Sequence, residues 1–151
     1  MNKKKITAII VIIFFVALSA VIGFMLIDRP AFTDIQKDEI SSVSYHIYYY
    51  ENNEPVYLPL PEENLDELLE LMQNIRIRGL GTDESGKYVG EIPFMFVVQM
   101  KDGKQIEFAA SNPHMKINGK YYSTEYEPAD ALAEFWREKA IEGRKEYGLD
   151  N

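Results

Sequence analysis

The longest pattern in the chain is an uninterrupted apolar segment near its N-terminus. Residues 6–27 are 22 positions without a charged side chain. As an α-helix with a rise of 1.5 Å per residue this segment is about 33 Å long, which matches the hydrocarbon thickness of about 30 Å of a bilayer. An Asp or Lys at mid-depth would cost about 3 kcal/mol, and the segment has none. The pattern predicts one transmembrane helix over residues 6–27.

A cleaved signal peptide is the alternative interpretation of the same segment. Ala17, Leu18 and Ser19 would then form the small-residue cleavage site. The apolar run continues through residues 21–27 beyond that site, whereas the apolar core of a signal peptide is about 7 to 15 residues long. We therefore expect the segment to be retained as a signal anchor.

The charges that flank the segment predict its orientation. Lys3, Lys4 and Lys5 precede it, whereas Asp28 and Arg29 follow it. Positive charge is retained preferentially on the cytoplasmic side of a membrane. We expect residues 1–5 in the cytoplasm and the C-terminal domain on the extracellular side of the cell membrane.

The next segment, residues 28–39, has no clear period and contains Pro30, which is typical of a short linker. We predict a stalk there and one folded domain over residues 40–151. The roughly 120 residues after the anchor are enough for one core, because a domain of that length buries well over half of the surface that its unfolded chain exposes.

Alternation of period two begins at residue 40. In residues 40–50 the β-branched and aromatic side chains predict a strand whose core face consists of Val43, Tyr45, Ile47 and Tyr49. Residues 55–60 indicate a short second strand, which Pro59 would confine to a sheet edge.

Two helices follow from apolar residues at helical spacing. In residues 65–75, Pro61 or Asn64 supplies the start, and Asn64 with Glu67 three residues later resembles a capping box. A final helix runs from Pro128 to about residue 147. The apolar stripe of the first helix consists of Leu65, Leu68, Leu69, Met72 and Ile75.

Between the two helices, glycine and polar residues separate apolar runs. Four glycines predict a mobile loop over residues 78–90, and residues 92–101, apolar on both faces, predict a central strand. Asp102-Gly103 and Asn118-Gly119 are signals for two-residue type I′ hairpin turns. The element order predicts an α+β fold with a mostly antiparallel sheet of four to five strands and two helices packed on one face.

Charge and composition exclude several classes of partner and of chemistry. All 24 acidic residues follow the apolar segment, so the domain is more acidic than the net charge of −8 of the whole chain. Such a surface repels phosphate backbones, and we expect no nucleic-acid partner. The absence of cysteine excludes disulfides, thiolate chemistry and cysteine zinc sites.

Candidate chemistry is sparse. His46 and His114 lie on different predicted strands and lack the spacing of zinc helices, so we expect no metal and no other cofactor. Acid pairs such as Glu62 and Glu63 resemble glycosidase carboxylates only in residue type, because they arise by chance in an acidic chain. Residues 82–86 lack the spaced ligands of an EF-hand. Without a nucleophile or phosphate-loop motif, we expect a protein that is not an enzyme.

The ten tyrosines are the least ordinary feature. Tyrosine joins a large apolar ring to a hydroxyl group, which suits a binding surface and a half-exposed sheet equally. If the core face of residues 40–50 points inward, His46, Tyr48 and Tyr50 share the other face. We take these three and Tyr122 as candidate partner contacts, and packing of the sheet as the alternative.

The turn motifs Asp102-Gly103-Lys104 and 117–122 (INGKYY), together with the anchor, resemble uncharacterised small membrane-anchored proteins and lipoproteins of Gram-positive bacteria. The resemblance covers residues 40–140 and implies a strand, helix, hairpin and terminal helix. The chain departs from the lipoproteins because it lacks the cysteine that carries the lipid. No functional residues carry over.

Three functions therefore remain as hypotheses. The first is a non-enzymatic module that binds an envelope protein or a cell-wall component through one sheet face. The second is a small-ligand or peptide sensor, in which the loop of residues 78–90 closes over a pocket between helix and sheet. The third is an envelope hydrolase, which requires converging carboxylates or a histidine in a cleft.

Overall fold

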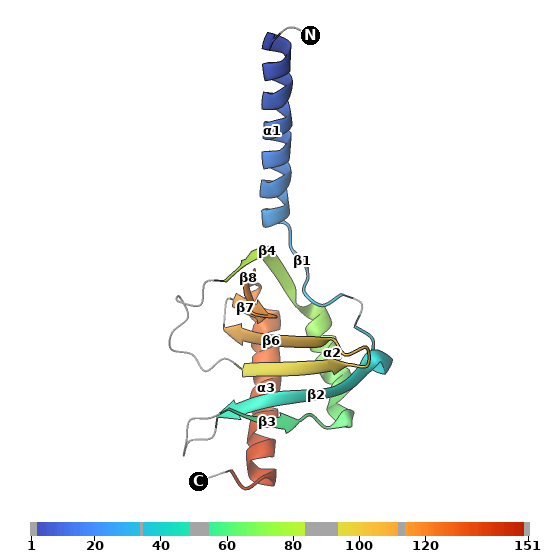
Figure 1. The fold of residues 1–151 in the computed structure, drawn as a ribbon. Helices are drawn as coiled ribbons and strands as arrows, with labels where there is room; N and C mark the ends of the chain where they lie inside the picture. The colour runs from blue at the N-terminus through green and yellow to red at the C-terminus, as the bar shows by residue number, and fades with distance from the viewer. Residues whose placement is uncertain (1–2, 34, 49–54, 84–93, 112–113, 150–151) are drawn as a thin grey trace.

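The computed structural model describes residues 3–33, 35–48, 55–83, 94–111 and 114–149. In these residues the chain forms one antiparallel sheet of eight strands in the order β1-β4-β8-β7-β6-β5-β2-β3, with three α-helices and two short 3-10 helices (Figure 1). The α+β class is confirmed, but the expected four to five strands are too few. The strands are β1 (Arg29–Pro30), β2 (Ile40–Tyr48), β3 (Pro55–Pro59), β4 (Arg76–Thr82), β5 (Phe94–Met100), β6 (Gln105–Ser111), β7 (His114–Ile117) and β8 (Lys120–Thr124).

The predicted apolar helix is present as α1 (Lys3–Leu26). Its segment Lys5–Gly23 is long and apolar enough to cross a membrane. Figure 1 shows α1 projecting away from the domain, with β6, β5, β2 and β3 lying across its axis and β3 farthest from it.

The helices α2 (Leu65–Asn74) and α3 (Tyr126–Glu146) pack against each other and cover one face of the sheet (Figure 1). The Tyr45 hydroxyl on β2 donates a hydrogen bond to the Lys139 carbonyl on α3 over 2.9 Å. The Phe96 ring on β5 stacks on Phe135 of α3 at 6.0 Å. The core therefore lies between this face and the two helices, and burial of its apolar side chains stabilises the layer.

The predicted alternation in β2 is confirmed where the structure describes it. Val43, Tyr45 and Ile47 are buried on the helix side, and Tyr49 lies outside the described residues. β3 is the last strand of the sheet, as Pro59 predicted, and β5 is an interior strand between β6 and β2.

One of the two predicted hairpin turns is wrong in type. Asn118 and Gly119 have φ of 48° and 82°, as a type I′ turn requires. At the other turn, of residues 101–104, only Gly103 has positive φ. The Gly103 N–H donates a hydrogen bond to the Met100 carbonyl, and the Met100 N–H donates one to the Lys104 carbonyl. This is a three-residue loop, stabilised by the Asp102 carboxylate, which accepts a hydrogen bond from the Lys104 N–H at 2.9 Å.

The expected loop over residues 78–90 begins instead as β4. Gly79 and Gly81 have φ of 93° and 74° and lie where the register between β4 and β8 shifts. Glycine at positive φ allows such a bulge without ending the strand. A Cβ on Gly81 would lie 2.7 Å from the Tyr122 ring, so this position also requires close approach. Residues 84–90 lie outside the described part.

The expected capping box at α2 is wrong. Asn64 has φ of −93° and ψ of −3° and makes no side-chain cap, because the chain is already turning through the 3-10 helix η2 (Glu62–Asn64). The final helix begins at Tyr126, two residues before Pro128, since proline is tolerated in the first turn of a helix.

The expected stalk is part of the folded domain. Arg29 and Pro30 form β1, which pairs with β4, and the Ala31 N–H donates to the Ile75 carbonyl at 2.9 Å. Phe32 is buried, with its ring 4.9 Å from Phe108. The 3-10 helix η1 (Lys37–Glu39) then lies against α2. A lone buried phenylalanine produces no periodic signal, which is why the sequence indicated a linker.

Candidate functional site

The sheet has one face that α2 and α3 leave uncovered, and we call this the open face (Figure 1). Residues that are paired directly across antiparallel strands point to the same side, so the register assigns its members. Ser44 pairs with Val97, Val97 with Glu107, and Lys116 with Tyr121. None of these side chains shares the side of Tyr45 and Phe96, which face α3.

The middle of the open face is apolar and its border is polar. Met95 and Val97 on β5 are half-buried, whereas Glu107 and Lys116 on β6 and β7 are exposed. The Lys116 ammonium group lies 5.4 Å from the centre of the Tyr121 ring, within the range of a cation–π contact. An apolar centre with a charged border is the usual composition of a transient protein interface.

His46 belongs to the open face by its register with Tyr57, but only 2% of it is exposed. Its ring lies 5.9 Å from that of Tyr57, and its carbonyl accepts a hydrogen bond from Trp136 Nε1 at 2.8 Å. Burial lowers the pKa of the His46 imidazole, because it disfavours the charged form. In this state a partner on the open face would not contact His46 directly.

The four predicted contact residues do not form one surface. Tyr122 pairs with Met115 on the helix side of the sheet, opposite to His46, and is half-buried beneath the Arg29 guanidinium group, which lies 5.7 Å from its ring. Tyr48 ends β2, and its side chain lies outside the described part, as does all of Tyr50.

Tyr57 is the aromatic residue that the sequence analysis missed. It lies on the edge strand β3 beside His46 and is 48% exposed, and the flanking Val56 and Leu58 turn toward the core. The signal was present as alternation in residues 55–59, but two prolines in five positions obscured it. On this edge of the face the exposed aromatic side chain among the described residues is that of Tyr57, whereas His46 is buried.

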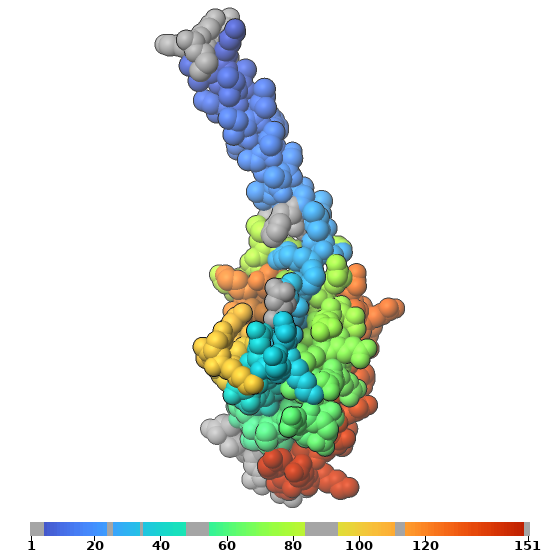
Figure 2. All heavy atoms as spheres, turned by 90° about the vertical axis from the view of Figure 1, so that its right-hand side faces the viewer, coloured from blue at the N-terminus to red at the C-terminus, as the bar shows by residue number. Residues whose placement is uncertain are grey.

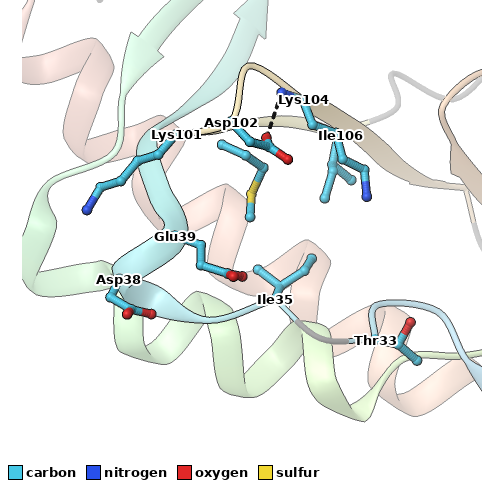
Figure 3. Close-up of a pocket in the computed structure, with 9 residues that line it drawn as sticks. Thr33, Ile35, Asp38, Glu39, Lys101, Asp102, Lys104 and Ile106 are labelled. Carbon is cyan, nitrogen blue, oxygen red and sulfur yellow. Dashed lines mark hydrogen bonds between the residues drawn. The ribbon is translucent and has the colours of Figure 1, made fainter.

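Two open pockets lie at another part of the domain, on either side of η1. One, of about 480 Å³, has Asp38 and Glu39 on one side and the charged turn of the β5–β6 hairpin on the other (Figure 3). The second, of about 570 Å³, lies between η1 and the start of β2. Neither has the position that the sensor hypothesis required, between helix and sheet beneath residues 78–90.

The described residues hold no cluster of side chains that could bind a metal ion. No three histidine or carboxylate side chains among them converge on a point. His114 lies on β7, separated from His46 on β2 by strands β5 and β6. Glu62 and Glu63 are exposed in η2, as are Glu125 and Glu127 around the start of α3.

The fold and this face define an α+β domain joined to an apolar helix, with α2 and α3 on one side of its antiparallel sheet and neither of them on the other. A comparison with family models, with curated proteins and with solved structures finds no match to the chain.

Proposed function

We propose that this protein is a membrane-anchored, non-enzymatic module that binds another envelope protein through its open face. The observation that carries the proposal is the half-buried apolar strip of Met95 and Val97, bordered by Glu107 and Lys116. A contiguous apolar patch on the surface of a soluble domain often marks a site that a partner or a ligand covers. Exposed Tyr57 supplies an aromatic anchor of the kind that contributes strongly to interfaces.

The anchor gives the module its location in this proposal. α1 inserts as a single transmembrane helix, with the Lys3 to Lys5 end in the cytoplasm and the domain outside the cell. Protease added to intact cells tests this orientation: the domain should be digested there, and a cytoplasmic marker should survive until the cells are lysed. Protection of the domain in intact cells would contradict it.

Site-specific photo-crosslinking tests the binding face. A photoreactive phenylalanine analogue replaces Tyr57 or Tyr121 in intact cells, and the control probe replaces Ile141, an exposed apolar residue on the outer side of α3. We expect the same adduct from both open-face positions and none from position 141.

The variant Val97→Glu tests whether the adduct depends on the apolar strip, with Ile141→Glu as the matched control. A carboxylate in the middle of the apolar strip would be desolvated by a bound partner, so the adduct should disappear, whereas Ile141→Glu should leave it unchanged. Adducts of equal yield from position 141, or adducts that persist in Val97→Glu, would contradict the proposal. If the probes crosslink to peptidoglycan fragments and not to a protein, the proposed protein partner is wrong and the open face binds the cell wall.

A further inference from the structure

The junction between α1 and the domain is short and held by several contacts. Only Ile27 and Asp28 separate the end of α1 from β1. The Asp28 carboxylate accepts two hydrogen bonds from the Arg78 guanidinium group, at 2.8 and 2.7 Å. Arg29 Nη2 donates to the Gly79 carbonyl at 2.6 Å. The first residues after α1 are therefore fixed on β4.

The pairing of β1 with β4 brings a particular part of β4 toward α1. Arg29 pairs with Ile77 and Pro30 with Arg76, so positions further along β4 lie progressively closer to the helix. α1 lies beside β4, and Figure 2 shows the chain passing from α1 directly onto this end of the domain. Leu80 is the apolar side chain of β4 on this approach to α1.

Leu80 is exposed although it belongs to a strand. Its exposed fraction is 52%, and Leu26, which ends α1, and Ile27, which follows it, are 67% and 62% exposed. Gly79 and Gly81 flank it at positive φ in the bulge of β4. The bulge thus presents a leucine toward water next to the end of an apolar helix, and the apolar surface of α1 continues onto the domain.

The charges at this edge complement a membrane surface. Arg76 is exposed on β4, in a domain that is otherwise strongly acidic, whereas Arg78 is already paired with Asp28 and Arg29 with the Gly79 carbonyl. Guanidinium groups pair with phosphate oxygens, and apolar side chains enter the boundary between headgroups and acyl chains.

We propose that the bilayer that holds α1 also receives Leu80, so that the edge formed by β1 and β4 rests in the phospholipid interface. This inference depends on the anchoring proposed above, and it adds a second membrane contact made by the folded domain itself. Arg76 then lies on the headgroup side of the interface, and Leu80, further along β4 toward α1, lies on its acyl-chain side.

Fluorescence from a single labelled site tests the inference in the full chain. Because the protein lacks cysteine, Leu80→Cys gives one site for an environment-sensitive dye, and Ile141→Cys, also exposed, gives the matched control on α3. Both proteins are reconstituted into phosphatidylglycerol liposomes, and flotation shows which protein is membrane-bound. Unchanged thermal unfolding of the two variants shows that the fold is retained.

We expect the dye at position 80 to emit at shorter wavelength, to be quenched several-fold more by nitroxide-labelled lipid, and to be quenched less by aqueous iodide than the dye at position 141. Equal emission and equal quenching at the two positions in floated protein would overturn the lipid contact while leaving the anchor intact. Failure of the protein to float would overturn the anchor and the lipid contact together.

Discussion

Gly143 of α3 lies close to side chains of β2 and β3. A Cβ at this position would collide with the Tyr45 hydroxyl and would lie 2.6 Å from Leu58 Cδ1. Alanine normally stabilises a helix by about 1 kcal/mol relative to glycine, but overpacking of a core costs about 1 to 3 kcal/mol. We expect Gly143→Ala to lower the free energy of unfolding by about 1 kcal/mol, the cost of overpacking less the gain in helix propensity, measured by urea unfolding of the full chain in detergent micelles.

A second substitution separates this collision from a general effect on the helix. In the Tyr45→Phe background, which already lacks the hydroxyl and its bond to the Lys139 carbonyl, Gly143→Ala should cost less than it does in the natural chain, since the nearest atom is then gone. A Gly143→Ala protein that is more stable than the natural chain would show that the contact is looser than the structure gives.

Tyr45 should make the free energy of unfolding sensitive to pH in the alkaline range. Burial, and after it the negative charge of groups near the end of α3, raises the pKa of its phenol from 10.0 to about 12. Below pH 10 both folded and unfolded chains hold the proton. Between these two pH values the unfolded chain releases it and the folded chain retains it, so the free energy of unfolding falls as pH rises. Urea midpoints measured across this range should fall more steeply for the natural chain than for Tyr45→Phe. Equal slopes would contradict the assignment.

At the scale of elements, the bulge of β4 depends on two glycines with different surroundings. Both have positive φ, which costs an alanine about 1 to 2 kcal/mol. A Cβ on Gly79 meets open space, whereas one on Gly81 meets the Tyr122 ring. Gly81→Ala should therefore destabilise the protein more than Gly79→Ala in urea unfolding. The reverse order would show that Tyr122 yields easily.

Phe32 distinguishes a docked segment from a free stalk. Its ring is 7% exposed and packs on Phe108, so Phe32→Ala should cost about 3 to 5 kcal/mol. The neighbouring Thr33 is exposed, and Thr33→Ala should change the free energy of unfolding by no more than about 0.5 kcal/mol. If both substitutions proved neutral, residues 28–39 would be a stalk in solution.

The sequence predicted the elements whose periodicity is strong and missed those that depend on tertiary contacts. β2, α2 and α3 have regular apolar stripes, and all three form near their expected bounds. β1 has two residues and β4 contains two glycines, so neither has a pattern of its own. Each becomes a strand because a neighbour supplies its hydrogen bonds.

The candidate site shows the same division. Alternation assigned His46 correctly to the side opposite Tyr45, but alternation carries no information on burial. Tyr122 was chosen for its aromatic ring, and its face follows only from the register of β7 with β8. Tyr57 lay between two prolines. Which side chains share a surface is decided by strand order, which a single sequence does not reveal.

At the scale of the whole molecule, α1 should determine where the protein is found. A chain that lacks residues 1–27 keeps β1 and its contacts with β4, so it should remain folded by circular dichroism and move from the carbonate-washed membrane fraction to the soluble fraction. A truncated chain that stays in the washed membranes, or a full-length chain that is soluble, would contradict the anchor.

The stacking of the strands along the direction of α1 determines how far the domain extends from the membrane. In the order of the strands, six spacings of about 4.8 Å separate β4 from β3, which is about 29 Å measured along the sheet. In an anchored protein the plane of the sheet would stand roughly perpendicular to the membrane. Tyr57, on β3, would then lie at the end of the domain farthest from the lipid. A binding partner would have to reach the open face from the side, within a few nanometres of the lipid. The two-residue junction is too short to let the domain extend farther from the membrane.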